Sequence, residues 1–457
     1  MTTSDLFSLI QSIYSAFLSI WWIFIPLFLF ILAKDLWIKY KRQEFIQKMD
    51  WIVLEVRPPQ DIKKTPYAME QFFAGLHGSQ SNPNFGLRFL QGATQSWFSM
   101  EMVSSEGDIH FFIKTLSVFR NLVESNIYAQ YPHAEINQVD DYTDVAPTDI
   151  PNDDYELWGT ELVLTKDDAY PIRTYVEFEK DIVADEQRID PLAALLEAMT
   201  KIGVGEHIWI QTLIRPIGDK WKEEGEKLRD DLIGRKKESK SGILGAIGSE
   251  LNEWRNVTSG AGAQMVVGGE LILDEPAKEE KKDDKPSMAS LTKSEQEVIN
   301  ALEKNMSKFG YEVIIRFVYF GRKDIFNKAN VVSVLGSFKQ FGTQHLNGFK
   351  PNAKVTPGID YSFQGKGTRD AYRKKRVFGD YKKRSFAQYS KYISYLNPLF
   401  FERWPILNWF FVRSQPFVLS IEELATIYHY PGEMVKTPMG AKVQAKKGGA
   451  PAGLPIG

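Results

Sequence analysis

The sequence of 457 residues contains no cysteine. This absence excludes a disulfide scaffold, a thiolate metal site and a cysteine nucleophile. The chain also has no large excess of positive or negative charge, because 56 Lys and Arg residues nearly balance 58 Asp and Glu residues. A protein that binds nucleic acid or acidic lipid over its whole surface would be strongly basic. Any such contact must therefore come from a local patch.

Catalytic motifs are also lacking. The six histidines are scattered, no HExxH pair is present, and no G-x-S-x-G nucleophile elbow occurs. Residues 365–368 resemble part of a phosphate-binding loop, but Gly358 lies too far upstream and Gly367 stands where the magnesium-binding hydroxyl is needed. The sequence thus predicts no catalytic residue, no metal site and no cofactor, and we expect the chain not to be an enzyme.

Residues 6–33 carry no charged side chain. A membrane-spanning helix needs about 20 apolar residues, so the run predicts a transmembrane anchor and juxtamembrane helix over residues 1–50. The basic residues that follow it predict a single-pass protein of the cell membrane, with the N-terminus outside and the body cytoplasmic. A buried core helix is the alternative. The residues assigned to the anchor are Trp21, Trp22, Pro26, Phe28, Lys34 and Trp37.

Residues 51–140 show the element order β-α-β-β-α-β. Strand-like alternation begins at Trp51, and a helix follows Pro66. A hairpin is expected around residues 104–108. The apolar spacing of the next helix predicts that one face packs on a sheet, through Leu116, Phe119, Val123 and Ile127. This order is typical of a ferredoxin-like, split βαβ domain.

The remaining chain shows several changes of composition. The predicted fold class is α+β, with the N-terminal transmembrane helix followed by ferredoxin-like α+β domains. The expected segments are an acidic linker over 141–156, the first part of a second α+β domain over 157–233, a flexible insertion over 234–290, the second part of that domain over 291–438, and a disordered tail over 439–457.

Basic residues gather within 366–384, and an apolar stretch with two tryptophans follows at 396–411. We expect residues 366–411 to form one exposed contact surface. Single-stranded nucleic acid, anionic lipid and a protein partner are the alternatives, beside a merely solvated helix face. The residues assigned to this surface are Arg369, Arg373, Lys374, Lys375, Arg376, Lys382, Lys383, Arg384, Trp404 and Trp409.

Several sequence blocks point to a family. They occupy residues 64–71, 119–132, 157–159, 422–431 and 436–438. These blocks resemble the non-ATPase region that precedes type IV secretion or conjugation ATPases in bacteria of the candidate phyla radiation. In the fused relatives a Walker-type ATPase follows the last block, whereas this sequence ends at Gly457 in a tail rich in Gly, Ala and Lys.

The resemblance implies a non-catalytic component of a secretion or DNA-transfer apparatus, anchored in the membrane. It would act as a platform for an ATPase that binds in trans. The position of the ATPase in the fused relatives places the docking region at 420–438, with Glu422, Glu423, Tyr428 and His429 as docking residues. The alternative is a nucleic-acid-binding subunit that uses residues 366–384.

Overall fold

The computed structural model describes residues 3–59, 62, 64–180, 190–233, 292–358, 366–386, 390–393, 396 and 415–432. The chain divides into two compact units. The first comprises residues 1–225 and 300–457, and the second comprises residues 226–299. The predicted insertion, the predicted tail and residues 404 and 409 lie outside the described residues. Within the second unit, Thr292 accepts a hydrogen bond from the backbone of Glu295 and so caps the start of α8 (Lys293–Met306).

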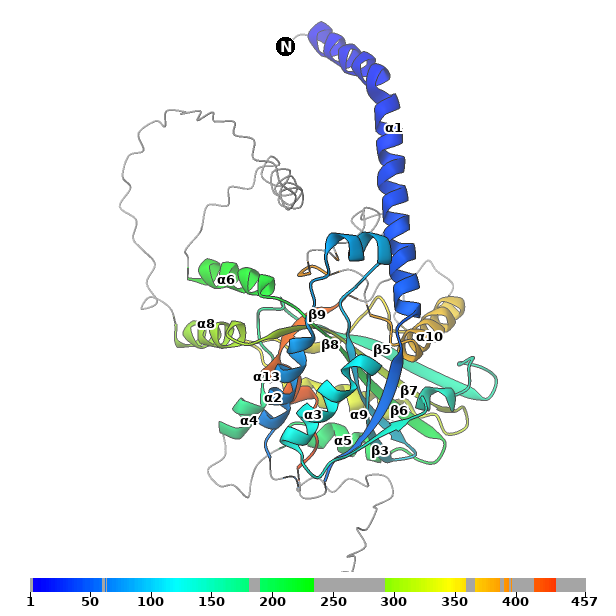
Figure 1. The fold of residues 1–457 in the computed structure, drawn as a ribbon, viewed down its shortest axis with the longest axis vertical. Coiled ribbons are helices and arrows are strands. Elements are labelled where there is room, and N and C mark those ends of the chain that lie inside the picture. Colours follow the sequence, from blue (N-terminus) through cyan, green and yellow to red (C-terminus); the bar gives the residue numbers. More distant parts are fainter. Residues whose placement is uncertain are drawn as a thin grey trace, which may run out of the picture. The chain divides into compact units, whose positions relative to one another are not determined.

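The first unit is built on one nine-stranded sheet, in which neighbouring strands pair antiparallel (Figure 1). The strand order is β4-β1-β3-β2-β6-β7-β5-β8, and β9 pairs with one end of β7. The strands are β1 (Trp51–Arg57), β2 (Phe98–Ser105), β3 (Asp108–Leu116), β4 (Glu135–Val139), β5 (Tyr155–Leu164), β6 (Glu206–Pro216), β7 (Gly310–Arg322), β8 (Phe349–Pro351) and β9 (Phe417–Ser420).

The helices connect and cover these strands. They are α1 (Thr3–Gln47), α2 (Tyr67–Leu76), α3 (Arg120–Gln130), α4 (Tyr175–Lys180), α5 (Ala193–Thr200), α6 (Lys220–Leu232), α8, α9 (Lys328–Phe338), α10 (Lys366–Lys382) and α13 (Ile421–Ile427). Short helical turns lie between them, among them η2 (Leu87–Gln91), η3 (Ser117–Phe119) and η4 (Tyr142–Asp144).

The two halves of the sheet follow the same path. The first half runs β1-α2-β2-β3-α3-β4 with strand order β4-β1-β3-β2, so the predicted element order over 51–140 is found. The second half contains β5-α5-β6-β7-α9-β8 in the corresponding order β8-β5-β7-β6. The second strand of each half, β2 and β6, pair with each other. The two predicted α+β domains therefore share one continuous sheet.

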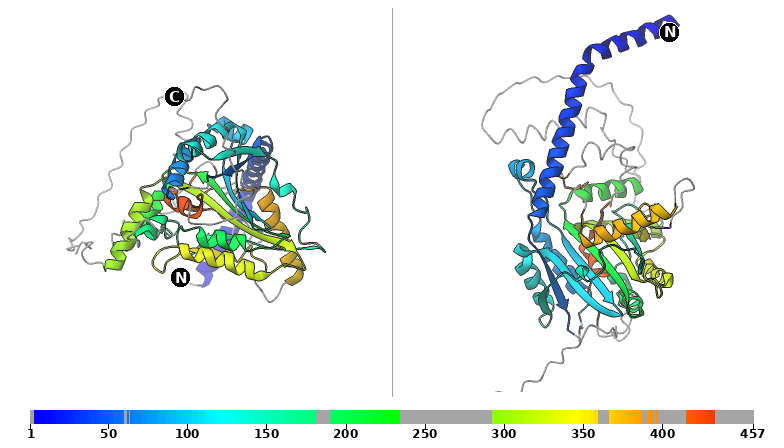
Figure 2. Two further views of the ribbon diagram at one scale, coloured as in Figure 1. Left: turned by 90° about the horizontal axis from the view of Figure 1, so that it is seen from below. Right: turned by 90° about the vertical axis from the view of Figure 1, so that its right-hand side faces the viewer.

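The two faces of the sheet carry different layers (Figures 1 and 2). Neighbouring residues of a strand point to opposite faces, and β7 shows this clearly. Phe317 and Tyr319 join the core cluster that includes residues of α2, α3, α5, α9 and α13. Val318 and Phe320 join a second cluster, which includes residues of α10. Of the four residues predicted to pack on the sheet, Val123 and Ile127 are fully buried and Phe119 packs against the first cluster, whereas Leu116 is the buried last residue of β3 and not part of the helix.

The turn of the hairpin between β2 and β3 consists of two residues. Ser105 pairs with Asp108, so Glu106 and Gly107 alone form the turn. Both have positive φ, 57° and 97°, as a two-residue turn of type I′ requires. Gly107 also leaves no room for a side chain, because a Cβ atom at this position would lie only 2.9 Å from the carbonyl oxygen of Thr200.

The prediction of a membrane anchor is contradicted. Among the helices that the structure describes, none combines the length and apolarity needed to cross a membrane. The expected transmembrane helix over 6–33 is therefore wrong, and with it the single-pass topology and the cell-membrane localisation. Helix α1 continues through Lys34 to Gln47 as one element, and on this part Asp35 and Arg42 are buried.

The residues assigned to the anchor belong to this same helix (Figure 2). Trp37 donates a hydrogen bond from Nε1 to the carbonyl oxygen of Phe89, at 3.0 Å, and so ties α1 to the turn η2. Lys34 lies 3.6 Å from the carboxylate of Asp35. Trp22, Pro26 and Phe28 are exposed, and the side chain of Trp21 is outside the described part.

Core packing under α3 gives the first prediction. Val123→Ala removes two methyl groups from a fully buried site and should lower the free energy of unfolding by about 2 kcal/mol. Val118→Ala is the matched control because Val118 is 75% exposed, and it should change stability by less than about 0.5 kcal/mol. Urea unfolding of the two variants measures both values. Equal losses would show that α3 does not pack on the sheet.

Candidate functional site

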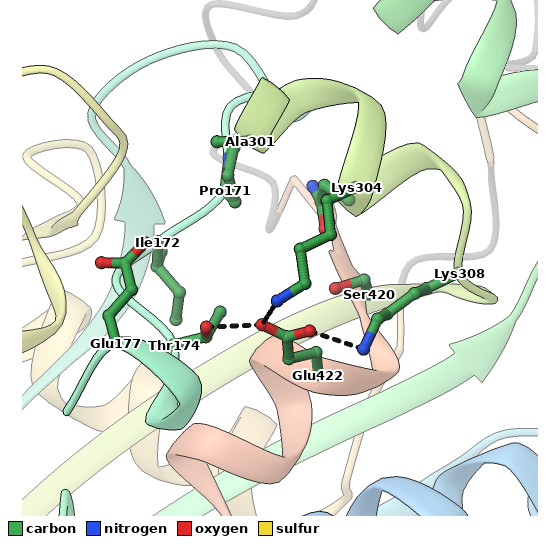
Figure 3. A pocket seen from close by; sticks show the side chains of 10 residues that line it. Pro171, Ile172, Thr174, Glu177, Ala301, Lys304, Lys308, Ser420 and Glu422 are labelled. Carbon is green, nitrogen blue, oxygen red and sulfur yellow. Dashed lines mark hydrogen bonds and ion pairs between the residues drawn. The ribbon is translucent and has the colours of Figure 1, made fainter. Parts of the chain in front are cut away.

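A pocket opens where three segments distant in sequence meet (Figure 3). The first precedes and begins α4, the second is the end of α8, and the third is the β9–α13 junction. The pocket holds about 310 Å³, part of which is open to solvent. It is lined by Pro171, Ile172, Thr174, Glu177, Ala301, Lys304, Asn305, Lys308, Ser420 and Glu422.

The carboxylate of Glu422 is the polar centre of the pocket (Figure 3). Its Oε1 accepts from Lys304 Nζ at 2.8 Å and from Thr174 Oγ1 at 2.5 Å. Its Oε2 lies 2.5 Å from Lys308 Nζ. The local sequence explains this position, because Ser420 caps α13 and the capping box with Glu423 fixes the first turn. Glu422 then projects from that turn toward α8.

Lys308 also lines the pocket and extends this network to α2. Its ammonium group also lies 2.6 Å from Glu70 on α2, and the other carboxylate oxygen of Glu70 accepts from Tyr175 at 2.7 Å. Glu70 and Glu422 are both buried, whereas the Lys304 side chain is 50% exposed. Lys304 is therefore the charged group of this network that solvent or a ligand reaches most easily.

The electrostatics favour binding over covalent chemistry. Burial alone would lower the pKa of Lys308, but hydrogen bonds to Glu422 and Glu70 outweigh it and raise the pKa above its usual value. Burial alone would raise the pKa of Glu422, but the hydrogen bonds from Lys304, Lys308 and Thr174 lower it overall. Lys308 thus stays an ammonium ion, whereas a nucleophilic lysine needs a depressed pKa.

The other predicted docking residues are buried. Glu423, Tyr428 and His429 each have at most 2% of their surface exposed. Glu423 accepts from the backbone N–H groups of Ile172 and Ser420, at 2.9 and 2.8 Å. The His429 Nε2 atom lies 2.9 Å from the carboxylate of Asp190. Of the predicted docking set, only Glu422 lines the pocket.

The basic segment is largely internal. Arg384 has a positive φ of 46° and is only 2% exposed. Its Nε and Nη2 atoms donate to the two carboxylate oxygens of Glu101, at 2.9 and 3.0 Å. Its Nη1 atom donates to Asp141 at 2.6 Å. Arg373 is buried and donates to the carbonyl oxygen of Thr356 at 2.7 Å. Neither arginine lies on an exposed contact surface.

The acidic linker pairs with this segment. Lys374 lies 2.7 Å from Glu156 and Lys375 lies 2.9 Å from Asp149. Of the other predicted contact residues, Arg376 lies 3.6 Å from Asp380, and Lys382 lies over the ring of Phe378. Arg369 is half-buried, and Lys383 is exposed. The expected surface over 366–411 is thus reduced, within the described residues, to the outer side of α10.

Under Arg384 a polar row crosses four neighbouring strands. Glu101 on β2 stands opposite Gln211 on β6, and Gln211 stands opposite Arg316 on β7. Gln211 donates to Glu101 at 3.0 Å, and Arg316 donates to Gln211 at 3.1 Å and to Glu161 on β5 at 3.0 Å. We call these four residues the polar row.

Sequence reasoning missed Lys304, Lys308, Glu70 and the polar row. One signal was available, since Glu70 lies between Met69 and Phe72 on the apolar face of α2, where an unpaired carboxylate would be costly. Nothing in the sequence indicated its partners Tyr175 and Lys308, which lie 105 and 238 residues further along the chain. Among the described residues, no group of His, Asp and Glu is arranged to hold a metal ion.

The fold and the pocket define an α+β protein of two fused ferredoxin-like halves with a charged surface pocket. The family described as Domain of unknown function (DUF8128) matches residues 32–442, and the chain belongs to this family. No curated protein matches the sequence at a significant level. The family description names no activity, so the resemblance to secretion proteins stays a prediction.

The Arg384 cluster gives a prediction for stability. Arg384→Met removes the cation from two carboxylates and leaves Glu101 buried without its charge partner, which should cost about 3–5 kcal/mol in urea unfolding. Lys383→Met changes the exposed neighbour and should cost less than about 0.5 kcal/mol. A small loss for Arg384→Met would show that the cluster is hydrated in solution.

Glu423 gives a prediction for pH. Burial raises the pKa of this carboxyl to about 7, above an unfolded value of about 4.3. The folded chain therefore holds the proton more tightly, and this stabilisation is present below about pH 4.3 and lost as pH rises through about 7. The stability difference between wild type and Glu423→Gln should shift by roughly 3 kcal/mol between pH 5 and 8. Urea unfolding across this range measures the shift, and a constant difference would contradict it.

Proposed function

We propose that the chain is a non-catalytic component of a type IV secretion or DNA-transfer-like apparatus and serves as a platform for an ATPase that binds in trans. The pocket at Lys304 and Glu422 is the contact point. One observation supports this proposal above all. Glu422 is the first residue of the fourth sequence block that resembles the secretion proteins, and it lies in a surface pocket beside the half-exposed Lys304.

The geometry of the pocket supports a binding role. Lys304 keeps donor capacity toward solvent while Glu422 holds its ammonium group in place. A carboxylate of a partner protein would add to this pair without the entropy cost of fixing a free lysine. Thr174, Asn305 and Ser420 supply further polar groups at the wall of the pocket. These features fit an acidic side chain at the end of a partner segment.

The pocket also lies at a suitable place in the fold. In the fused relatives implied by the resemblance, the ATPase follows the last block, a few residues beyond α13. An ATPase bound in trans would occupy the corresponding region, and α13 lines the pocket through Glu422. The buried residues Glu423, Tyr428 and His429 would then support the shape of the site from within.

The nucleic-acid alternative has less support. Single strands bind to exposed cations and exposed aromatic rings. In the described part of 366–384, two arginines are buried and two lysines are paired with the acidic linker. The aromatic rings of Phe378 and Tyr381 are buried against Trp209.

Charge reversal at the pocket tests the proposal. We expect Lys304→Glu to reduce co-purification of an ATPase with the full chain by about tenfold, because it places three negative charges together at Glu422 and the partner carboxylate. Lys201→Glu is the control, since Lys201, the residue after α5, is exposed and does not line the pocket. Capture from native extracts, with the ATPase identified by mass spectrometry and by ATP turnover, measures the effect.

Two results would contradict the proposal. One is that wild-type chain recovers no ATPase under conditions that retain other partners. The other is that Lys304→Glu and Lys201→Glu recover the ATPase equally well while both variants unfold at the wild-type urea concentration.

A further inference from the structure

Helix α1 carries an exposed stripe of mostly apolar residues. Residues 26, 29, 33, 36 and 40 are spaced alternately by three and four positions, which is the a and d spacing of a heptad repeat. All five are exposed, with Leu29, Leu36 and Tyr40 at 53%, 56% and 59%. We call Pro26, Leu29, Ala33, Leu36 and Tyr40 the seam.

The opposite side of α1 is the side that packs on the body. Asp35 and Arg42 are buried, and Ile38 and Phe45 are half-buried. In the heptad that the seam defines, these four residues take positions c and f, which point away from a and d. Trp37, which donates to Phe89 of η2, takes position e at the flank of the seam, while the five seam residues themselves are exposed. Trp22 continues the same spacing one step toward the N-terminus.

From this arrangement we propose that α1 pairs in parallel with α1 of a second copy of this chain, through the seam. A 3.5-residue apolar repeat on an exposed helix buries its side chains most simply against the same repeat. Both copies have the body at the same end of the helix, so a parallel pair brings equal positions together. The two bodies then lie on the outer sides of the helix pair.

Charge complementarity supports a second copy as the occupant. With the seam at a and d, Lys39 takes position g and Glu44 takes position e of the next heptad. In a parallel two-stranded coiled coil, g of one chain faces the following e of the other. Lys39 of each copy thus faces Glu44 of the other, giving two equivalent pairs of opposite charge. Within its own helix, Glu44 lies 2.8 Å from Lys41 and 2.7 Å from Lys48.

Single cysteines test the pairing directly, since the natural sequence has none. Leu36→Cys places a thiol at d, where the two chains are closest. Lys34→Cys places a thiol on the same exposed stretch at position b, on the outside of the pair. Under mild oxidation of the full chain, we expect Leu36→Cys to form a disulfide-linked dimer at least tenfold faster than Lys34→Cys.

Charge reversal supplies an independent readout. Lys39→Glu would face Glu44 of the other copy and should raise the dimer dissociation constant roughly tenfold in sedimentation equilibrium. Lys34→Glu, the off-seam control, should change it less than about threefold. The proposal is overturned if the two cysteine variants crosslink at equal rates, if the full chain stays monomeric up to about 100 μM, or if the two charge reversals weaken dimers equally.

Discussion

The pairing of β2 with β6 is the interaction on which the rest of the structure depends. It runs from Phe98 opposite Ile214 to Ser105 opposite His207 and joins two halves that follow the same ferredoxin-like path. A shift by one residue would turn every side chain of a strand to the other face. The polar row prevents such a shift, because Glu101 and Gln211 meet only in this register. Arg384 then closes over Glu101 from the far end of the chain.

This joining explains how the charged groups are used. The chain is nearly neutral. In its described part, Lys374 and Lys375 of α10 pair with the acidic linker outside the core, and Glu161 and Arg316 form a buried pair inside the sheet. Buried pairs of this kind contribute specificity of fold more than net stability. Lys304 differs from them, since it is paired with a buried carboxylate but half-exposed itself. Arg57 on β1, which is 46% exposed and paired with the buried Glu55, shows the same combination, but Lys304 also lines a pocket.

Local patterns predicted the elements of the first half well. The apolar spacing of α3 and the hairpin at Glu106 and Gly107 both depend on residues close in sequence. The continuous sheet was not predictable, because the pairing of β2 with β6 joins strands about a hundred residues apart without a motif. The burial of Arg373 and Arg384 in the basic segment was not predictable for the same reason. Arg384 and Lys374 find their carboxylates in residues 101–156, which the sequence does not connect to them.

Hydrogen exchange of the full chain, alone and with an ATPase recovered in the capture experiment, tests the proposed platform most directly. The account predicts slower exchange on binding in residues 172–177, 300–308 and 420–424, the three segments that form the pocket, and unchanged exchange in residues 366–386. Protection confined to residues 366–386, or no protection at the pocket while the ATPase is bound, would contradict it.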